Sequence, residues 1–403
     1  MPRHQHVDLA LPVAIDDSGE CGGQVSAEEP RKSLPIAAAP QASHLDDYGH
    51  HLDDIKVWCS LETRCDIRRY VQQMGVCGLY VIKNRTVRVE LYHSTDICEG
   101  GKNDISKEYG VASMAKSLSS TLLGQVLAEN YHLRTRDQFE AVMQREVGSF
   151  LNLRNRMMLA ESYSTVRLDQ LLLMRSDIQW RESYRPGLLS DSHAFDNQVR
   201  TPPRKQSLIG FASRYRLTRH RDARFNYSAL DSAMAIAVAR DISPLRPLKA
   251  FERGIWTMIG AAHSASWNVD INGDPIGSCC FKARIDDLAR FGDFVLHSGQ
   301  GKGVPAAWFD LATAPTTSRF AGVEDESEQA DDSCALGYGY FWWLRKNHAD
   351  YFAFGRYGQF IHIYPRDNVV IVQLSAWKEV PANSHARCIA LKTHDVIVRE
   401  LRH

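Results

Sequence analysis

The residues with the clearest chemical potential are a serine and a lysine, Ser113 and Lys116. They stand at the start of an apolar pattern that predicts a helix over 113–130. A separation of three residues is just under one helical turn, so the hydroxyl and the ammonium would project from one face. A serine at a helix start also lies among unpaired backbone N–H groups at the positive end of the dipole, which favours an oxyanion and a neutral lysine. The pair therefore indicates a serine nucleophile that a lysine can deprotonate.

The motif by itself is common, and a plain structural interpretation stays open. Ser113 could be a helix N-cap, with Lys116 in solvent. A second match, Ser375-Ala-Trp-Lys378, stands at the end of an apolar, strand-like run rather than at a helix start. The choice between these interpretations depends on what other segments bring to the same site.

Two further segments could complete such a site. Phe225-Asn-Tyr-Ser-Ala-Leu-Asp231 opens another predicted helix and supplies Tyr227, whose hydroxyl could relay a proton from the serine to a leaving group. Phe354-Gly-Arg-Tyr-Gly-Gln-Phe360 enters a predicted strand. Its glycines would let the strand edge approach a ligand closely and donate a backbone N–H. Their alternatives are a buried aromatic residue and an ordinary Gly-rich turn.

The order of these motifs resembles that of the serine β-lactamase and penicillin-binding-protein superfamily. In detail the sequence is similar to the class C-like esterase branch, which includes the nylon-dimer hydrolases. The resemblance covers roughly residues 75–400, and the segments that carry it are 112–117, 168–176, 178–184, 224–228, 283–292, 337–343 and 358–359.

The resemblance implies a role for each matched residue. Ser113 would be the acylated nucleophile, Lys116 its general base, and Tyr227 the proton shuttle to the leaving group. The backbone N–H groups of Ser113 and Gln359 would form the oxyanion hole. The substrate-binding residues implied in the same way are Tyr184, on a loop that covers the acyl site, and Arg356, Tyr357 and Gly358.

Three departures from the superfamily pattern put the substrate in doubt. The third motif usually reads Lys-Thr-Gly, or has His before Gly-Gly, whereas this chain has Arg356-Tyr-Gly358. Ala229 stands where lactamases carry an asparagine that holds the substrate amide. Asp177 replaces the glycine that usually follows Met-Arg-Ser. These changes argue against β-lactamase activity and leave the Ser–Lys–Tyr core intact.

The elements that must position these residues are strands at both ends of the chain and helices between them. Residues 78–82 and 87–92 predict a hairpin, and 360–364 and 369–374 predict two more strands around a Pro-Arg-Asp-Asn turn. Helical periods cover 230–240, 247–259, 285–297 and 386–401, and the aromatic run 336–344 reads as a strand.

These elements, together with the resemblance, predict an α+β fold of the β-lactamase type. An antiparallel sheet flanked by helices would be built from both chain ends, with a mostly helical insertion. The expected organisation is a flexible N-terminal arm over 1–45, an α/β domain over 46–112 and 331–403, and a mainly helical domain over 113–330 that carries both motifs.

Composition removes several classes of function. The 403 residues contain 48 basic and 48 acidic side chains, so nothing suggests a nucleic-acid or polybasic membrane partner. No apolar run approaches the ~20 residues that span a bilayer. The early apolar stretch 9–15 lacks the features of a secretory signal, so we expect the protein to be cytoplasmic. The nine cysteines form no C-x-x-C, so we expect free thiols, no metal and no cofactor.

The sequence thus predicts a serine hydrolase that cleaves an ester or amide of a small molecule through an acyl-enzyme. An acyltransferase with the same intermediate is the first alternative, and a non-catalytic binding module of the same fold is the second. A homodimer is compatible with the sequence, and the acyl and leaving groups are not specified by it.

Overall fold

The computed structural model describes residues 33–47, 52, 54–93, 98, 102–183, 190–201, 206–218, 224–301, 303–314, 334, 336–345, 349–377 and 383–402. Every structural statement below concerns these residues. Within them, no helix combines the length and the apolar character that crossing a membrane requires.

The largest element is a sheet whose strands come from both ends of the chain. Their order is β10, β11, β12, β13, β14, β5, β6, β2, and all neighbours are antiparallel except β2 and β6. In that order their bounds are Leu336–Tyr338, Trp343–Arg345, Tyr351–Gly355, Gln359–Tyr364, Val369–Ser375, Val76–Lys83, Thr86–Tyr92 and Asp46–Asp47. The sheet confirms the predicted α+β class and its construction from both chain ends.

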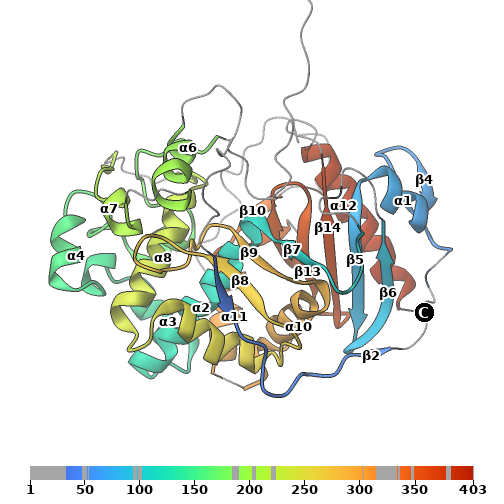
Figure 1. The fold of residues 1–403 in the computed structure, drawn as a ribbon, viewed down its shortest axis with the longest axis horizontal. Coiled ribbons are helices and arrows are strands. Elements are labelled where there is room, and N and C mark those ends of the chain that lie inside the picture. The colour runs from blue at the N-terminus through green and yellow to red at the C-terminus, as the bar shows by residue number, and fades with distance from the viewer. Residues whose placement is uncertain are drawn as a thin grey trace, which may run out of the picture.

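Helices cover both faces of this sheet, as the right half of Figure 1 shows. Helices α1 (Ile67–Gln73) and α12 (Asn383–Glu400) pack on one face, where Val369 and Ile371 point. Helix α10 (Ile285–Leu296) packs on the other face, against Val370 and Val372. Burial on both faces explains why β14 reads as an unbroken apolar run rather than an alternating one.

The predicted hairpin forms between β5 and β6. Its two-residue turn, Asn84-Arg85, has positive φ at both positions (50° and 67°). This geometry is that of a type I′ turn, whose twist matches the twist of the flanking strands.

A second, four-stranded sheet lies between the main sheet and the helical part. Its order is β1 (Ser33–Ile36), β8 (Ala265–Asn268), β9 (Phe281–Arg284) and β7 (Glu108–Gly110). Strands β3 (Lys56–Trp58) and β4 (Arg64–Asp66) form a separate pair. Because β1 pairs with β8 along its whole length, the expected flexible arm over 1–45 is wrong for its last part. The sequence of the arm contains proline and polar residues without an apolar period, so it gives no indication that β1 pairs with β8, more than 200 residues away.

The middle of the chain is mostly helical, on the left of Figure 1. The longest helices there are α2 (Ala115–Tyr131) and α8 (Ala229–Ile242), which pack against each other. The shorter α-helices are α3 (Arg136–Met143), α4 (Leu153–Met158), α5 (Leu168–Leu172), α6 (Asp191–Phe195), α7 (Leu208–Ala212), α9 (Pro247–Phe251) and α11 (Ala306–Thr313). The 3₁₀ segments are η1 (Ala112–Met114), η2 (Val147–Ser149) and η5 (Ser298–Gly301), and the π segments are η3 (Asp196–Arg200) and η4 (Glu252–Trp256).

Two predicted elements are divided in the structure. The aromatic run 336–344 forms β10 and β11 with a turn between them, because Phe341 adopts a left-handed φ of 61° that a strand cannot contain. The predicted helix over 247–259 continues from α9 into the π segment η4. Both divisions depend on local backbone conformation, which hydrophobic periodicity does not report.

The expectation of free thiols is wrong for eight of the nine cysteines. The structure contains disulfides Cys59–Cys65, Cys77–Cys98, Cys279–Cys280 and Cys334–Cys388, and Cys21 lies outside the described residues. Pairing requires Cα atoms within about 7 Å, a condition that irregular spacing along the sequence cannot reveal. Folding brings together partners as far apart as 54 positions.

Candidate active site

Ser113 lies in the short segment η1, immediately before α2. The residue before it, Ala112, has a φ of 46°, in the left-handed region that costs a non-glycine residue about 1–2 kcal/mol. Such strain concentrates at functional sites, where surrounding packing holds it. Here the turn leaves Ser113 partly exposed although Met114 and the residues after it are buried. The sequence predicted the serine at a helix start, and the structure adds the sharp turn that presents it.

Lys116 is buried beneath the partly exposed Ser113, and only 2% of the surface of Lys116 is exposed. Its Nζ donates to Ser113 Oγ and to the Ser278 carbonyl, both at 3.1 Å. The buried position excludes the interpretation of Lys116 as a solvated surface residue. The Ser278 carbonyl was not anticipated, because a backbone acceptor carries no sequence signature.

Tyr227 is the third member of the group. Lys116 Nζ lies 4.6 Å from the centre of its ring, over the aromatic face, so the ammonium gains a cation–π contact. The ring is stacked on Trp343 at a centroid distance of 5.8 Å and meets Tyr338 edge-on. The structure therefore brings Ser113, Lys116 and Tyr227 together, although the proton relay through the tyrosine hydroxyl stays a prediction.

A buried acid, Asp231, supports the start of α8 just beyond Tyr227. Its Oδ1 accepts hydrogen bonds from the hydroxyls of Tyr163 and Ser176, both at 2.8 Å, and its backbone N–H donates to the N-cap Ser228. Its Oδ2 is buried without a partner. Burial raises the pKa of the Asp231 carboxyl to about 7. Sequence reasoning did not single out Asp231, since an acid in a first helical turn usually faces solvent.

A second acid, Glu182, lies beside the position that departs from the lactamase pattern. Its Oε2 accepts the backbone N–H of Ala229 at 3.0 Å and the indole N–H of Trp180 at 2.6 Å. The carboxylate thus satisfies the exposed N–H end of α8 next to Tyr227. Tyr184, two residues further along the same loop, lies outside the described residues.

The β12–β13 hairpin forms the opposite side of the site. Gly355 ends β12 and pairs with Gln359, and a Cβ on Gly355 would lie 2.4 Å from the Val111 carbonyl. This close approach sets the hairpin directly against the segment that carries Ser113. The Gln359 side chain bonds the Ser375 backbone at both its N–H and its carbonyl, which anchors β13 to β14. The assignment of Ser113 and Gln359 N–H groups to an oxyanion hole stays a prediction.

The three residues between these strands were predicted to bind substrate. Tyr357 and Gly358 have positive φ (68° and 87°), and the half-buried Arg356 lays its guanidinium over the Tyr357 ring at 4.7 Å. A Cβ on Gly358 would collide with the Trp377 ring, which explains the glycine there. Their contact with substrate remains untested.

The rival serine, Ser375, is structural. It ends β14, its hydroxyl accepts a hydrogen bond from Gln373 Nε2 at 3.1 Å, and its backbone is held by Gln359. Lys378 of the same motif lies outside the described residues.

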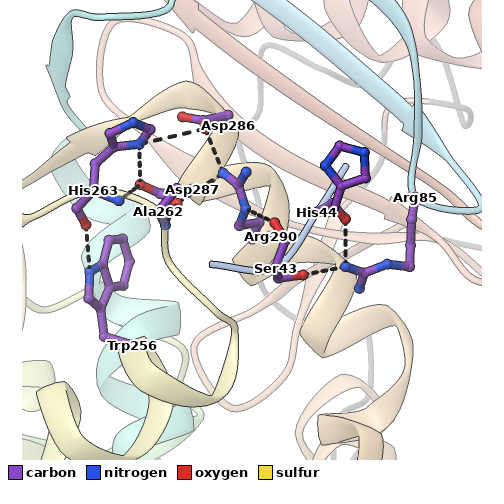
Figure 2. A network of polar contacts seen from close by, with 9 residues as sticks. All are labelled: Ser43, His44, Arg85, Trp256, Ala262, His263, Asp286, Asp287 and Arg290. Carbon is purple, nitrogen blue, oxygen red and sulfur yellow. Dashed lines mark hydrogen bonds and ion pairs between the residues drawn. The ribbon is translucent and has the colours of Figure 1, made fainter. Parts of the chain in front are cut away.

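One cluster in the described chain has the residue types of a metal site. His263, Asp286 and Asp287 bring one ligand atom each within 4.8 Å of one another. Figure 2 shows why the cluster is better explained as structural: the Arg290 guanidinium lies between the carboxylates, 2.5 Å from Asp286 Oδ2 and 3.0 Å from Asp287 Oδ1. The arginine supplies the positive charge that a cation would bring. Asp287 also accepts the N–H groups of Ala262 and His263.

A cavity of about 290 Å³ lies elsewhere, at the end of α12. Its charged lining includes Asp350, Asp395 and Arg402, and none of the predicted site residues. Asp395 is paired with the buried Arg345, and Arg402 with Asp367. The lining contains no serine, threonine or cysteine that could act as a nucleophile, and the acids named here are paired with arginines. We therefore assign no reaction to this cavity.

The Beta-lactamase family model matches residues 66–393, which include the whole Ser113–Lys116–Tyr227 group. The chain belongs to the Beta-lactamase family.

The chain is also similar to individual proteins, to one in sequence and to others in fold. The 6-aminohexanoate-dimer hydrolase of Paenarthrobacter ureafaciens is 24% identical over 162 residues, 38% of this chain, and the match spans only 40% of that enzyme's length. A Bacillus anthracis structure described as a 6-aminohexanoate-dimer hydrolase has a TM-score of 0.73 at 17% identity and covers 92% of each chain. A hydrolase with promiscuous acyltransferase activity has a TM-score of 0.56 at 13% identity, over 82% of this chain and 96% of its own.

Proposed function

We propose that this Beta-lactamase family protein is a serine hydrolase that cleaves an ester or amide of a small molecule through an acyl-enzyme on Ser113. The observation that carries the proposal is the hydrogen bond from the buried Lys116 to Ser113 Oγ. Lys116 Nζ is the group placed to take the hydroxyl proton as Oγ attacks the substrate carbonyl. Backbone N–H groups stabilise the oxyanion, each such donor contributing about 3–4 kcal/mol in known enzymes. Tyr227 returns the proton to the leaving group, and water then releases the acid.

The test is covalent labelling followed by intact mass spectrometry. A fluorophosphonate and a panel of p-nitrophenyl esters should each add one group to the wild-type protein, and the label should map to Ser113. Ser113→Ala should lose the label and turnover while its circular dichroism spectrum stays unchanged. Ser375→Ala, which changes the serine of the other S-x-x-K, is the matched control and should still be labelled. A label that survives in Ser113→Ala would contradict the assignment.

Acyl transfer is the second candidate, because a protein of similar fold is a hydrolase with promiscuous acyltransferase activity. The same acyl-enzyme would react with an amine or alcohol instead of water. Product analysis with and without a series of acceptors separates the two, since transfer produces a new ester or amide and hydrolysis produces only the acid.

We further propose that Arg356 selects substrates with an anionic group near the scissile bond. The hairpin places it next to Gly355, which touches the Ser113 segment. Arginine remains charged and presents a planar fork of donors that matches a carboxylate. A carboxylate-bearing ester should have a kcat/KM about ten- to a hundredfold above that of its methyl-capped analogue, and Arg356→Gln should remove the difference. Equal kcat/KM values for the two esters in the wild type would exclude this role.

A further inference from the structure

The loop that holds the catalytic lysine contains an unusual covalent link. Cys279 and Cys280, adjacent in the chain, form a disulfide just before β9. Cys280 has a φ of 69°, which a residue with a side chain adopts only where something holds it. The two cysteines keep 6% and 8% of their surface exposed. None of the roles described above uses this pair.

The link is connected to the proposed active site by one peptide unit. The Ser278 carbonyl, bonded directly to the Cys279 nitrogen, accepts the hydrogen bond from Lys116 Nζ. The position of this carbonyl therefore helps to set the distance from Lys116 to Ser113 Oγ. The carbonyl before it, that of Gly277, accepts a hydrogen bond from Ser119 on α2, so the loop contacts the same helix twice.

Neighbouring hydrogen bonds hold the disulfide loop on both sides. The Cys279 N–H donates to the Ile276 carbonyl at 3.0 Å, and the Cys279 carbonyl accepts the Trp267 indole N–H at 2.9 Å. The Cys280 carbonyl accepts the Asn268 N–H at 3.1 Å. A change of backbone conformation at Cys280 must therefore be taken up within a few residues, and Ser278 is one of them.

A buried arginine makes the two sulfurs chemically distinctive. Arg200 Nη1 lies 3.6 Å from each Sγ, the arginine is 1% exposed, and its Nη2 pairs with Asp196 at 2.6 Å. A guanidinium beside a sulfur stabilises the thiolate, which is the species that enters thiol–disulfide exchange.

From this arrangement we propose that Cys279–Cys280 is a thiol–disulfide exchange site that controls the general base Lys116. The reductant is a dithiol: its two sulfurs form a cyclic disulfide, the Cys279–Cys280 bond breaks, and the two electrons pass to the cysteine sulfurs. One dithiol proton goes to one cysteine sulfur and the other is released to solvent, which leaves the second cysteine as a thiolate beside Arg200. Reduction releases Cys280 from its left-handed conformation and moves the Ser278 carbonyl away from Lys116. The reduced protein acylates Ser113 more slowly.

Whether Cys279 and Cys280 undergo thiol–disulfide exchange can be tested without an activity assay. The native protein is alkylated with N-ethylmaleimide before and after graded dithiothreitol, and the labelled peptides are mapped by mass spectrometry. Cys279 and Cys280 should be labelled only after reduction. Labelling of both in the native, unreduced protein would overturn the proposal.

The control of Lys116 rests on the proposed function and is tested by the rate of fluorophosphonate labelling at Ser113. Reduction should slow labelling by about tenfold, the effect of losing one hydrogen bond to a charged group, and reoxidation should restore it. Cys279→Ser/Cys280→Ser should have the slow rate with or without dithiothreitol. The matched control Cys59→Ser/Cys65→Ser, which removes a different disulfide, should keep the redox response. Equal rates in both redox states of the wild type would overturn the proposal.

Failure of the proposed function has a different signature, the absence of labelling in every redox state. In that case the rate of backbone amide hydrogen exchange tests whether the disulfide and the lysine are linked. Reduction of the wild type should speed exchange in peptides that cover 276–282 and 112–118, and the Cys279→Ser/Cys280→Ser protein should show the fast exchange without reductant. Unchanged exchange in both peptides would overturn the link between disulfide and lysine.

Discussion

At the scale of single residues, the site is defined by what surrounds Lys116. Its Nζ has a hydroxyl, a backbone carbonyl and an aromatic face as neighbours, and all three come from different parts of the chain. Each neighbour restricts where the ammonium or amine can lie. The same restriction links the lysine to Tyr227, so the two should act as one unit.

Lys116→Ala, Tyr227→Phe and the double variant should therefore lose similar amounts of activity. If both residues serve one proton relay, removing either breaks it, and removing the second costs little more. The measurement is kcat/KM for an activated ester in all four proteins. Losses that add strictly in the logarithm of the rate would contradict a shared relay.

Asp231 should make the stability of the protein depend on pH. Burial raises the pKa of its carboxyl from 3.8 to about 7, so between these values the folded protein holds a proton that the unfolded chain has lost. The free energy of unfolding therefore falls as pH rises through this window. Asp231→Asn removes the titration and keeps an acceptor for Tyr163 and Ser176.

The gain in stability on Asp231→Asn should be about 2–3 kcal/mol larger at pH 8 than at pH 5, because one pKa unit corresponds to ~1.4 kcal/mol. Urea unfolding at both values measures it. Asp54→Asn, at an exposed position, is the control and should show no such difference. A gain that does not change with pH would mean that Asp231 is ionised throughout.

At the scale of elements, the site depends on a close approach between a hairpin and a 3₁₀ turn. Gly355 at the end of β12 touches Val111 and Ala112, the two residues before the nucleophile. A backbone approach of this kind requires the absence of a side chain. It places the β12–β13 turn, with Arg356, beside Ser113.

Gly355→Ala should thus reduce activity far more than it reduces stability. The new Cβ would lie 2.4 Å from the Val111 carbonyl, so either the hairpin or the nucleophile segment must move. A displacement of about 1 Å can cost on the order of a hundredfold in kcat/KM. Gly210→Ala, in α7, is the matched control, since its Cβ would meet only the Ser207 hydroxyl at 3.2 Å. Wild-type activity in Gly355→Ala would show that the approach is not needed.

At the scale of the whole molecule, one polar network joins distant parts of the chain. Arg290 on α10 bonds the Ser43 carbonyl near the N-terminus as well as Asp286 and Asp287 (Figure 2). Arg85 reaches the Ser43 hydroxyl and the His44 carbonyl from the β5–β6 turn. The network fastens the segment after β1 to the face of the main sheet that α10 covers.

Arg290→Met should lower the free energy of unfolding by about 3–5 kcal/mol, because two buried carboxylates lose their cation. The exposed pair Arg402–Asp367 provides the comparison: its arginine side chain is 59% exposed, and Arg402→Met should lower the free energy of unfolding far less than Arg290→Met does. Urea unfolding of both variants checks the prediction. Similar small losses in the two would show that the network is not a stabilising one.

The sequence by itself determined the core of the fold and the three candidate catalytic residues. Apolar periods located most of the strands and helices because burial on one or both faces leaves a direct record in residue order. Ser113, Lys116 and Tyr227 were found because each has a reactive side chain within a motif. Both kinds of signal are local, so they need no knowledge of distant contacts.

Only the tertiary structure decided the features that depend on contacts between distant segments. The pairing of β1 with β8, the four disulfides, the Ser278 carbonyl at Lys116 and the burial of Asp231 belong to this group. The pKa of a carboxyl and the partner of a lysine are set by neighbours in space, and the chain order does not state them. For the same reason Arg290 rather than a metal ion can neutralise Asp286 and Asp287, a fact that appears only when α10 and the 262–263 loop meet.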